Sequence, residues 1–215
     1  MKGLFLGVLA IIIVGIGGLV YRNAVERPLQ PISCPVDALV CPDGTSVGRT
    51  GSTCTFAVCV PPNVALPAIA IAFALPDGFT ETTISGEESV ATYEMTSSTT
   101  DALSRIVIRR YSINASSTAL AAIQQTAIGA ASGEPVSATS FSSRVLGTHR
   151  FTIVTIDRFE GVVDTAYYLA RGTDVIRFDA IDTGVMNWTD ANLNVATLPA
   201  HAALLKLLST LQGKG

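Results

Sequence analysis

The longest apolar stretch opens the chain. Residues 3–21 (GLFLGVLAIIIVGIGGLVY) contain no charged side chain, and Lys2 and Arg22 flank them. A helix of this length would extend about 30 Å, which matches the hydrocarbon thickness of a bilayer. Since Arg22 and Asn23 stand where a cleavage site of small residues would be needed, the pattern predicts an uncleaved transmembrane anchor over residues 1–23 rather than a cleavable signal peptide.

Beyond residue 62 the pattern changes to short runs in which bulky apolar residues alternate with small or polar ones. Such alternation is typical of strands, and glycine or glycine-rich turns separate several of the runs. The predicted strand regions are 68–75, 89–95, 104–113, 136–147, 149–160, 164–172 and 174–181. Because the connections are mostly short, we expect the strands to pair antiparallel.

Two segments in the same region show helical spacing of apolar residues. They are residues 117–131, with Ser116 or Ser117 as the expected N-cap, and residues 198–212, with Pro199 in the first turn. The predicted order is β-β-β-α-β-β-β-β-α. An apolar sheet face needs a cover, so we expect an α+β fold in which the antiparallel sheet packs with two helices as an α/β/α sandwich.

Part of this layout has a counterpart in a known family. FALPDGF near the start, YYL followed by DVIRFDA near the end, and the closing leucine-rich helix resemble the PsbP-like (Mog1-like) α/β/α sandwich. The resemblance is one of layout and covers most of residues 63–215. Families with this layout mostly act as accessory or binding proteins, so the resemblance implies a binding role and no particular chemistry.

All four cysteines lie within 26 residues, at positions 34, 41, 54 and 59. The spacing C-x6-C-x12-C-x4-C lacks the C-x2-C pairs that a structural zinc site normally uses. Cys34, Cys41, Cys54 and Cys59 are therefore predicted to form two disulfides, and the three possible pairings stay open. Disulfides persist in oxidising compartments, which places this part of the chain outside the cytoplasm.

The segment around these cysteines is predicted to be a stapled spacer. CPDGTSVGRTGSTCTFAVC resembles a four-cysteine module that recurs beside membrane anchors in bacterial envelope proteins. Prolines on either side fit a stiff connector. The predicted organisation is therefore an anchor at 1–23, a linker with the cysteine module at 24–62, and an extracytoplasmic α+β domain at 63–215.

Charge narrows the choice of partners. Only 14% of the residues are charged, and the net charge of −3 is spread without a block of one sign. Phosphate backbones require a concentrated basic surface, so a nucleic-acid partner is excluded. The predicted partners are the membrane, through residues 3–21, and an envelope protein, and the oligomeric state stays open.

No catalytic or metal-binding signature accompanies these features. The only histidines are His149 and His201, and no G-x-S-x-G motif marks a nucleophile. Asp157, Glu160 and Asp164 lack the order of a calcium loop. We therefore expect no cofactor, no metal and no enzymatic activity. A hydrolase that uses His149 or His201 is the alternative from another class, and a pilin-like surface subunit is a third.

Two surfaces are candidates for contact with a partner. Trp188, the only tryptophan, follows Met186 in a loop after the last predicted strand. Gln124 and Gln125 lie in the middle of residues 112–133, which contain no charged side chain. Burying an uncharged helix face costs little desolvation. The sequence thus predicts a single-pass protein with a cytoplasmic N-terminus, whose extracytoplasmic domain binds a partner or serves as a scaffold.

Overall fold

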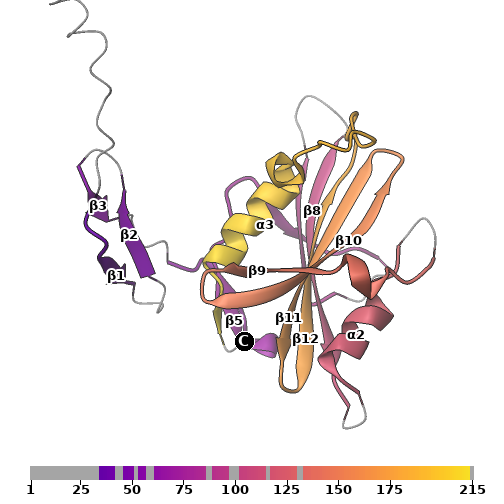
Figure 1. Cartoon of the computed structure of the whole chain (residues 1–215), viewed down its shortest axis with the longest axis horizontal. Coiled ribbons are helices and arrows are strands. Elements are labelled where there is room, and N and C mark those ends of the chain that lie inside the picture. Colours follow the sequence, from indigo (N-terminus) through magenta and orange to yellow (C-terminus); the bar gives the residue numbers. More distant parts are fainter. Residues whose placement is uncertain are drawn as a thin grey trace, which may run out of the picture. The chain divides into compact units, whose positions relative to one another are not determined.

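The computed structural model describes residues 34–41, 46–50, 53–56, 61–85, 89–96, 102–114, 117–129 and 133–213 (Figure 1). The chain divides into two compact units, the larger of which contains residues 58–215. The disulfide-bonded residues Cys34 and Cys54 belong to the smaller unit. The predicted domain boundaries at residues 23 and 62 stay predictions.

The predicted single-pass membrane localisation is contradicted. Among the described residues, no helix is long and apolar enough to cross a membrane. The longest described helix has 11 residues, which span about 17 Å, roughly half of a hydrocarbon core. The apolar run 3–21, on which the prediction depended, lies outside the described residues.

The predicted α+β class is also wrong, because strands dominate the fold. Strands make up 46% of the described residues and form three sheets, whereas the same part of the chain contains two α-helices, α2 (Ala119–Thr126) and α3 (Pro199–Ser209). The helix expected over 117–131 ends at Thr126 and begins after Thr118, whose hydroxyl accepts from Ala121 N, so neither Ser116 nor Ser117 is the N-cap. Several strands have two or three residues, too few to show alternation.

The main sheet has seven strands, and every neighbouring pair is antiparallel. Its order is β6-β7-β8-β12-β11-β10-β9. The strands are β6 (Thr80–Thr82), β7 (Ala91–Thr96), β8 (Leu103–Ser112), β9 (Ser142–Leu146), β10 (His149–Phe159), β11 (Val162–Arg171) and β12 (Asp174–Asp182). β8 and β12 are distant in sequence but pair along nine residues. This pairing places the two long central strands at the middle of the domain.

The two α-helices pack on opposite faces of this sheet. Alternate residues of a strand point to opposite faces. On β12, Ile176 and Phe178 join the larger core with Leu204 of α3, whereas Val175 joins a second core with Ile123 of α2. Because both faces are covered, most side chains of β11 and β12 are buried, whichever face they point to.

Two small sheets complete the part of the chain that the structure describes. The first consists of β13 (Gln212–Gly213), β5 (Ile71–Phe73) and β4 (Val64–Leu66), and β4 and β5 are joined by the 3₁₀ helix η1 (Pro67–Ile69). The second consists of β1 (Ala38–Val40), β2 (Ser46–Thr50) and β3 (Thr55–Phe56) in the cysteine-rich segment. Two further 3₁₀ helices are η2 (Ala138–Ser140) and η3 (Val195–Thr197).

Candidate functional site

Two turns meet at one end of the main sheet. Between β10 and β11 the turn consists of Glu160 and Gly161, whose φ angles are 49° and 79°. Positive φ at both central residues is the geometry of a type I′ turn, and its twist matches that of the flanking strands. The loop after β12 is attached to this turn, because Val185 N donates to Gly161 O at 2.9 Å.

Arg158 fixes the same loop a second time. Its guanidinium donates to the backbone carbonyls of Trp188 and Asp190. The carboxylate of Asp190 accepts from Asn192 N at 2.8 Å, a local hydrogen bond that orders the loop further. The two oxygens that accept from Arg158 are backbone carbonyls. The position of the loop therefore depends little on the side chains that it presents outward.

Three large apolar side chains lie at these turns, two of them exposed and the third, Trp188, half-buried. Phe159 is 46% exposed and Met186 is 95% exposed. The rings of Phe159 and Trp188 are 6.1 Å apart at 64°, an edge-to-face pair. We call Phe159, Met186 and Trp188 the aromatic tip. Apolar side chains held outward on a rigid loop are typical of binding surfaces, where Trp and other aromatics contribute most of the affinity.

The aromatic tip contains two of the four predicted contact residues and one that sequence analysis missed. Phe159 lies in a strand, as the run 149–160 predicts, and it is the last residue of β10 before the Glu160–Gly161 turn. Gly161, which forms the turn, is the signal in the sequence that could have placed Phe159 at the end of the sheet. Gln124 and Gln125 are exposed on α2, which packs over Tyr168 and Val175 at the opposite end of the sheet. The structure therefore does not bring the glutamines together with Trp188 and Met186.

His201 does not have the arrangement of a hydrolytic triad. Its Nδ1 lies 2.7 Å from Asp182 Oδ2, and Ser104 Oγ donates to Asp182 Oδ1 at 2.7 Å. In a triad the histidine stands between the serine and the carboxylate, whereas here the carboxylate stands between the other two. Burial raises the pKa of Asp182, but hydrogen bonds from His201, Ala200 N and Ser104 outweigh burial and lower the pKa overall. Asp182 thus serves as an ionised cap at the start of α3.

His149 is also held by structural contacts. Its Nε2 lies 3.0 Å from Gly213 O and its Nδ1 lies 3.2 Å from Thr148 Oγ1. The side chain is buried, and its ring packs at 6.3 Å from Phe151. Among the described residues, neither histidine bonds to a serine or cysteine. The geometry therefore disfavours the hydrolase alternative.

A cluster of charged side chains lies buried between α2 and the sheet. Asp179 accepts from Arg177 Nε at 2.6 Å and from Arg109. Arg177 also donates to Thr126 O at 2.5 Å, at the C-terminal end of α2. Asp164 is 8% exposed, and its Oδ1 has no hydrogen-bond partner. Burial, reinforced by the charge of Asp179, raises the pKa of Asp164 well above its usual range.

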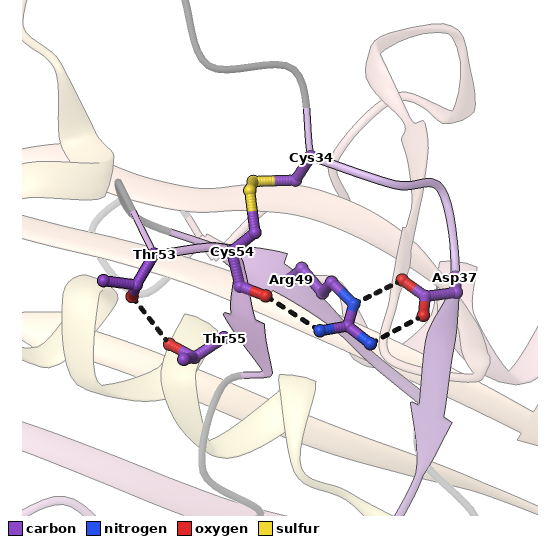
Figure 2. Close-up of a disulfide and its surroundings, with 6 residues drawn as sticks. All are labelled: Cys34, Asp37, Arg49, Thr53, Cys54 and Thr55. Atoms are coloured by element: carbon purple, nitrogen blue, oxygen red, sulfur yellow. Dashed lines mark hydrogen bonds and ion pairs between the residues drawn. A yellow bond between two sulfur atoms is a disulfide. The ribbon is translucent and has the colours of Figure 1, made fainter.

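The cysteine-rich segment contains the Cys34–Cys54 disulfide, with the two Cα atoms 5.3 Å apart (Figure 2). Arg49 donates to both carboxylate oxygens of Asp37, at 2.7 and 2.9 Å, and to Cys54 O at 3.0 Å. Cys41 is disulfide-bonded as well. Of the predicted cysteines, Cys59 lies outside the described residues. The disulfide prediction is thus confirmed for Cys34 and Cys54, and this bond selects one of the three open pairings.

Comparison with known proteins does not show a family for this chain. No protein-family model matches the sequence, and no curated protein is similar to it at a significant level. A crystal structure of a protein from Bacteroides thetaiotaomicron VPI-5482 is similar over 67% of this chain, with 11% identity and a TM-score of 0.39. The match covers 45% of that protein, so this chain spans less than half of its length. The PsbP-like resemblance stays a prediction.

Proposed function

We propose that the protein is an extracytoplasmic binding protein and that the aromatic tip is its recognition surface. The observation that carries this proposal is the exposure of Phe159 and Met186 beside the half-buried ring of Trp188, on turns fixed by hydrogen bonds to backbone atoms. No role in folding requires Met186 to be almost fully exposed, whereas contact with a partner would bury it.

The rigidity of the tip supports this function energetically. Ordering a flexible loop on binding opposes association, so a preformed loop leaves more of the contact energy available. Here the type I′ turn, the Val185–Gly161 bond and the two Arg158 bonds order the loop before any partner arrives. Burial of an aromatic side chain in a pocket of the partner would then contribute most of the affinity.

The proposed compartment rests on the disulfides. Cys34 and Cys54 are bonded to each other and Cys41 is bonded too, as is usual for proteins of oxidising compartments. The proposal includes no catalytic step. Asp182, rather than the histidine, occupies the bridging position in the group that Ser104, Asp182 and His201 form.

Site-specific photocrosslinking in the source cell tests the proposal. A photoreactive phenylalanine derivative replaces Met186, and the matched control carries it at Gln124 on α2. We expect a discrete crosslinked protein from position 186, lost when Trp188→Ala is added. Equal crosslinking from both positions, or crosslinking that Trp188→Ala leaves unchanged, would contradict recognition by the aromatic tip.

A further inference from the structure

A second candidate site, which is polar, lies at the opposite end of β11 from the aromatic tip. β11 has ten residues, so its ends are about 30 Å apart. At the far end, an open pocket of about 420 Å³ is lined by the β11–β12 turn, by residues 68–70 and by Arg110 of β8. None of these residues belongs to the aromatic tip.

One buried carboxylate in this pocket is shared by two guanidiniums. Asp174 is 1% exposed and accepts from Arg171 Nε and Nη2, at 2.7 and 2.6 Å, and from Arg110 Nε at 2.6 Å. The hydrogen bonds from Arg171, followed by that from Arg110, lower the pKa of Asp174 against the effect of burial. With two arginines and one aspartate, the side chains that line the pocket carry one net positive charge.

The two arginines differ in how many of their donors are used. Arg171 bonds through its third nitrogen, Nη1, to Ile69 O at 2.7 Å. Arg110 is 43% exposed, its Nη1 makes one long bond of 3.4 Å to Ala68 O, and its Nη2 has no hydrogen-bond partner among the described residues. The hydroxyl of Thr173, exposed on the turn, makes no hydrogen bond within the described part of the chain either. The pocket thus presents one guanidinium nitrogen, Arg110 Nη2, and one hydroxyl, Thr173 Oγ1, that make no hydrogen bond within the described part of the chain.

We propose that this pocket binds the carboxylate group of a small organic acid through Arg110 Nη2 and Thr173 Oγ1. A hydrogen bond from a guanidinium N–H to a carboxylate oxygen is charge-assisted, and a threonine hydroxyl can donate a second hydrogen bond. One carboxylate neutralises the single net positive charge of the lining residues, whereas a phosphate dianion would leave excess negative charge beside Asp174. This site goes beyond the proposed function, since it uses none of the residues of the aromatic tip.

A titration of the ¹⁵N-labelled full chain, followed by NMR at neutral pH and low salt, tests the proposal. The probe is N-acetylglycine, and the neutral matched compound is N-acetylglycinamide. We expect saturable shifts of the backbone amide signals of Gly172 and Thr173 with the acid and none with the amide. Added salt should weaken the response, because exposed charges are screened.

Variants assign the response to Arg110. Arg110→Gln should weaken binding about fivefold, as expected for loss of a partly exposed ion pair. The fold should persist because Arg171 still holds Asp174 with two hydrogen bonds, and unchanged signals elsewhere in the spectrum would verify this. Arg150→Gln, an exposed arginine on β10, should leave binding unchanged. Trp188→Ala should also leave it unchanged, so failure of this site and failure of the aromatic tip are distinguishable.

Three results would overturn the proposal. The first is an equal response to N-acetylglycinamide, which would show that the carboxylate is not recognised. The second is unchanged affinity in Arg110→Gln. The third is tighter binding of inorganic phosphate than of N-acetylglycine, which would assign the pocket to phosphate instead.

Discussion

At the scale of single residues, the face of the sheet under α2 differs from an ordinary apolar core. Arg177 and Asp179 occupy alternate positions of β12 and are both buried. Both have hydrogen-bond partners, because Asp179 accepts from two guanidiniums and Arg177 donates to a backbone carbonyl of α2. Asp164 is the exception, since one of its oxygens is buried without a hydrogen bond. An ionised carboxylate in such a position is costly.

We expect the Asp164→Asn variant to lose less stability than the wild type as pH rises. The pKa of Asp164 is raised in the folded state, first by burial and then by Asp179. The folded state therefore holds the proton more tightly than the unfolded state, and stability falls as pH rises from the unfolded pKa through the folded one. Relative to the wild type, the variant should gain on the order of 1–3 kcal/mol, the cost of an unsatisfied buried group, as pH rises from the unfolded pKa of about 4 into the alkaline range.

Denaturant unfolding of both proteins across this pH range is the measurement. The groups that face Asp164 are Asp157 of β10, Asp179 and Arg177 of β12, and Arg109 of β8, and all are unchanged in the variant. Asp77→Asn, at an exposed position, is the matched control and should follow the wild type. Parallel curves for the wild type and Asp164→Asn would show that Asp164 contributes no pH dependence.

At the scale of elements, α3 is positioned at both ends by contacts with the sheet. At its start, Asp182 of β12 accepts from Ala200 N at 2.8 Å and from His201 N at 3.3 Å. At its end, the turn between β9 and β10 lies against the helix. Gly147 in this turn has a φ of 57°, and a Cβ atom there would lie 2.8 Å from Ser209 O. The turn must therefore contain glycine both for its backbone angle and for this close approach.

Replacing this glycine should destabilise the fold. Gly147→Ala places a side chain in the left-handed region and against a backbone carbonyl that cannot rotate away, so we expect a loss of about 2 kcal/mol or more in the free energy of unfolding. Gly172→Ala is the matched control, because no atom lies within 4 Å of its Cβ position and its φ is not positive. Thermal and denaturant unfolding measure both variants. Equal effects of the two substitutions would contradict the close packing of the turn on α3.

At the scale of the whole molecule, the main sheet and the cysteine-rich segment rely on different sources of stability. The larger unit has a core of buried aromatic and aliphatic side chains on each face of its main sheet. The described part of the cysteine-rich segment has short strands and one residue, Cys41, among its buried apolar side chains. A segment of this size cannot bury enough apolar surface to fold without covalent closure.

Loss of the Cys34–Cys54 disulfide should therefore act locally. In a Cys34→Ser/Cys54→Ser variant we expect trypsin to cleave after Arg49 much faster than in the wild type, because a disulfide of this span contributes about 3 kcal/mol. The melting temperature of the larger unit should stay unchanged. Limited proteolysis with mass spectrometry and a thermal melt measure the two effects in the variant and in the oxidised wild type. A matching fall in the melting temperature would show that the two units are stabilised together.

Several elements could be predicted from sequence because their residues carry the signal locally. The runs at 104–113, 149–160, 164–172 and 174–181 coincide with β8, β10, β11 and β12, which are long enough for alternation to be visible. The region 198–212 contains α3. In contrast, β4, β6 and β13 have two or three residues each and exist only because a neighbouring strand provides hydrogen-bond partners. Missing such strands is one reason why the α+β class was wrong.

By itself the sequence determined the long strands, the C-terminal helix and the presence of disulfides, because periodicity, proline position and clustered cysteines are local properties of the chain. Only the tertiary structure decided which distant segments meet. It paired β8 with β12, put Phe159 beside Trp188, and gathered Arg110, Arg171 and Asp174 around one pocket. These contacts depend on strand order and on the close fit of side chains from separate elements. Neither is encoded in the spacing of residues along any one segment.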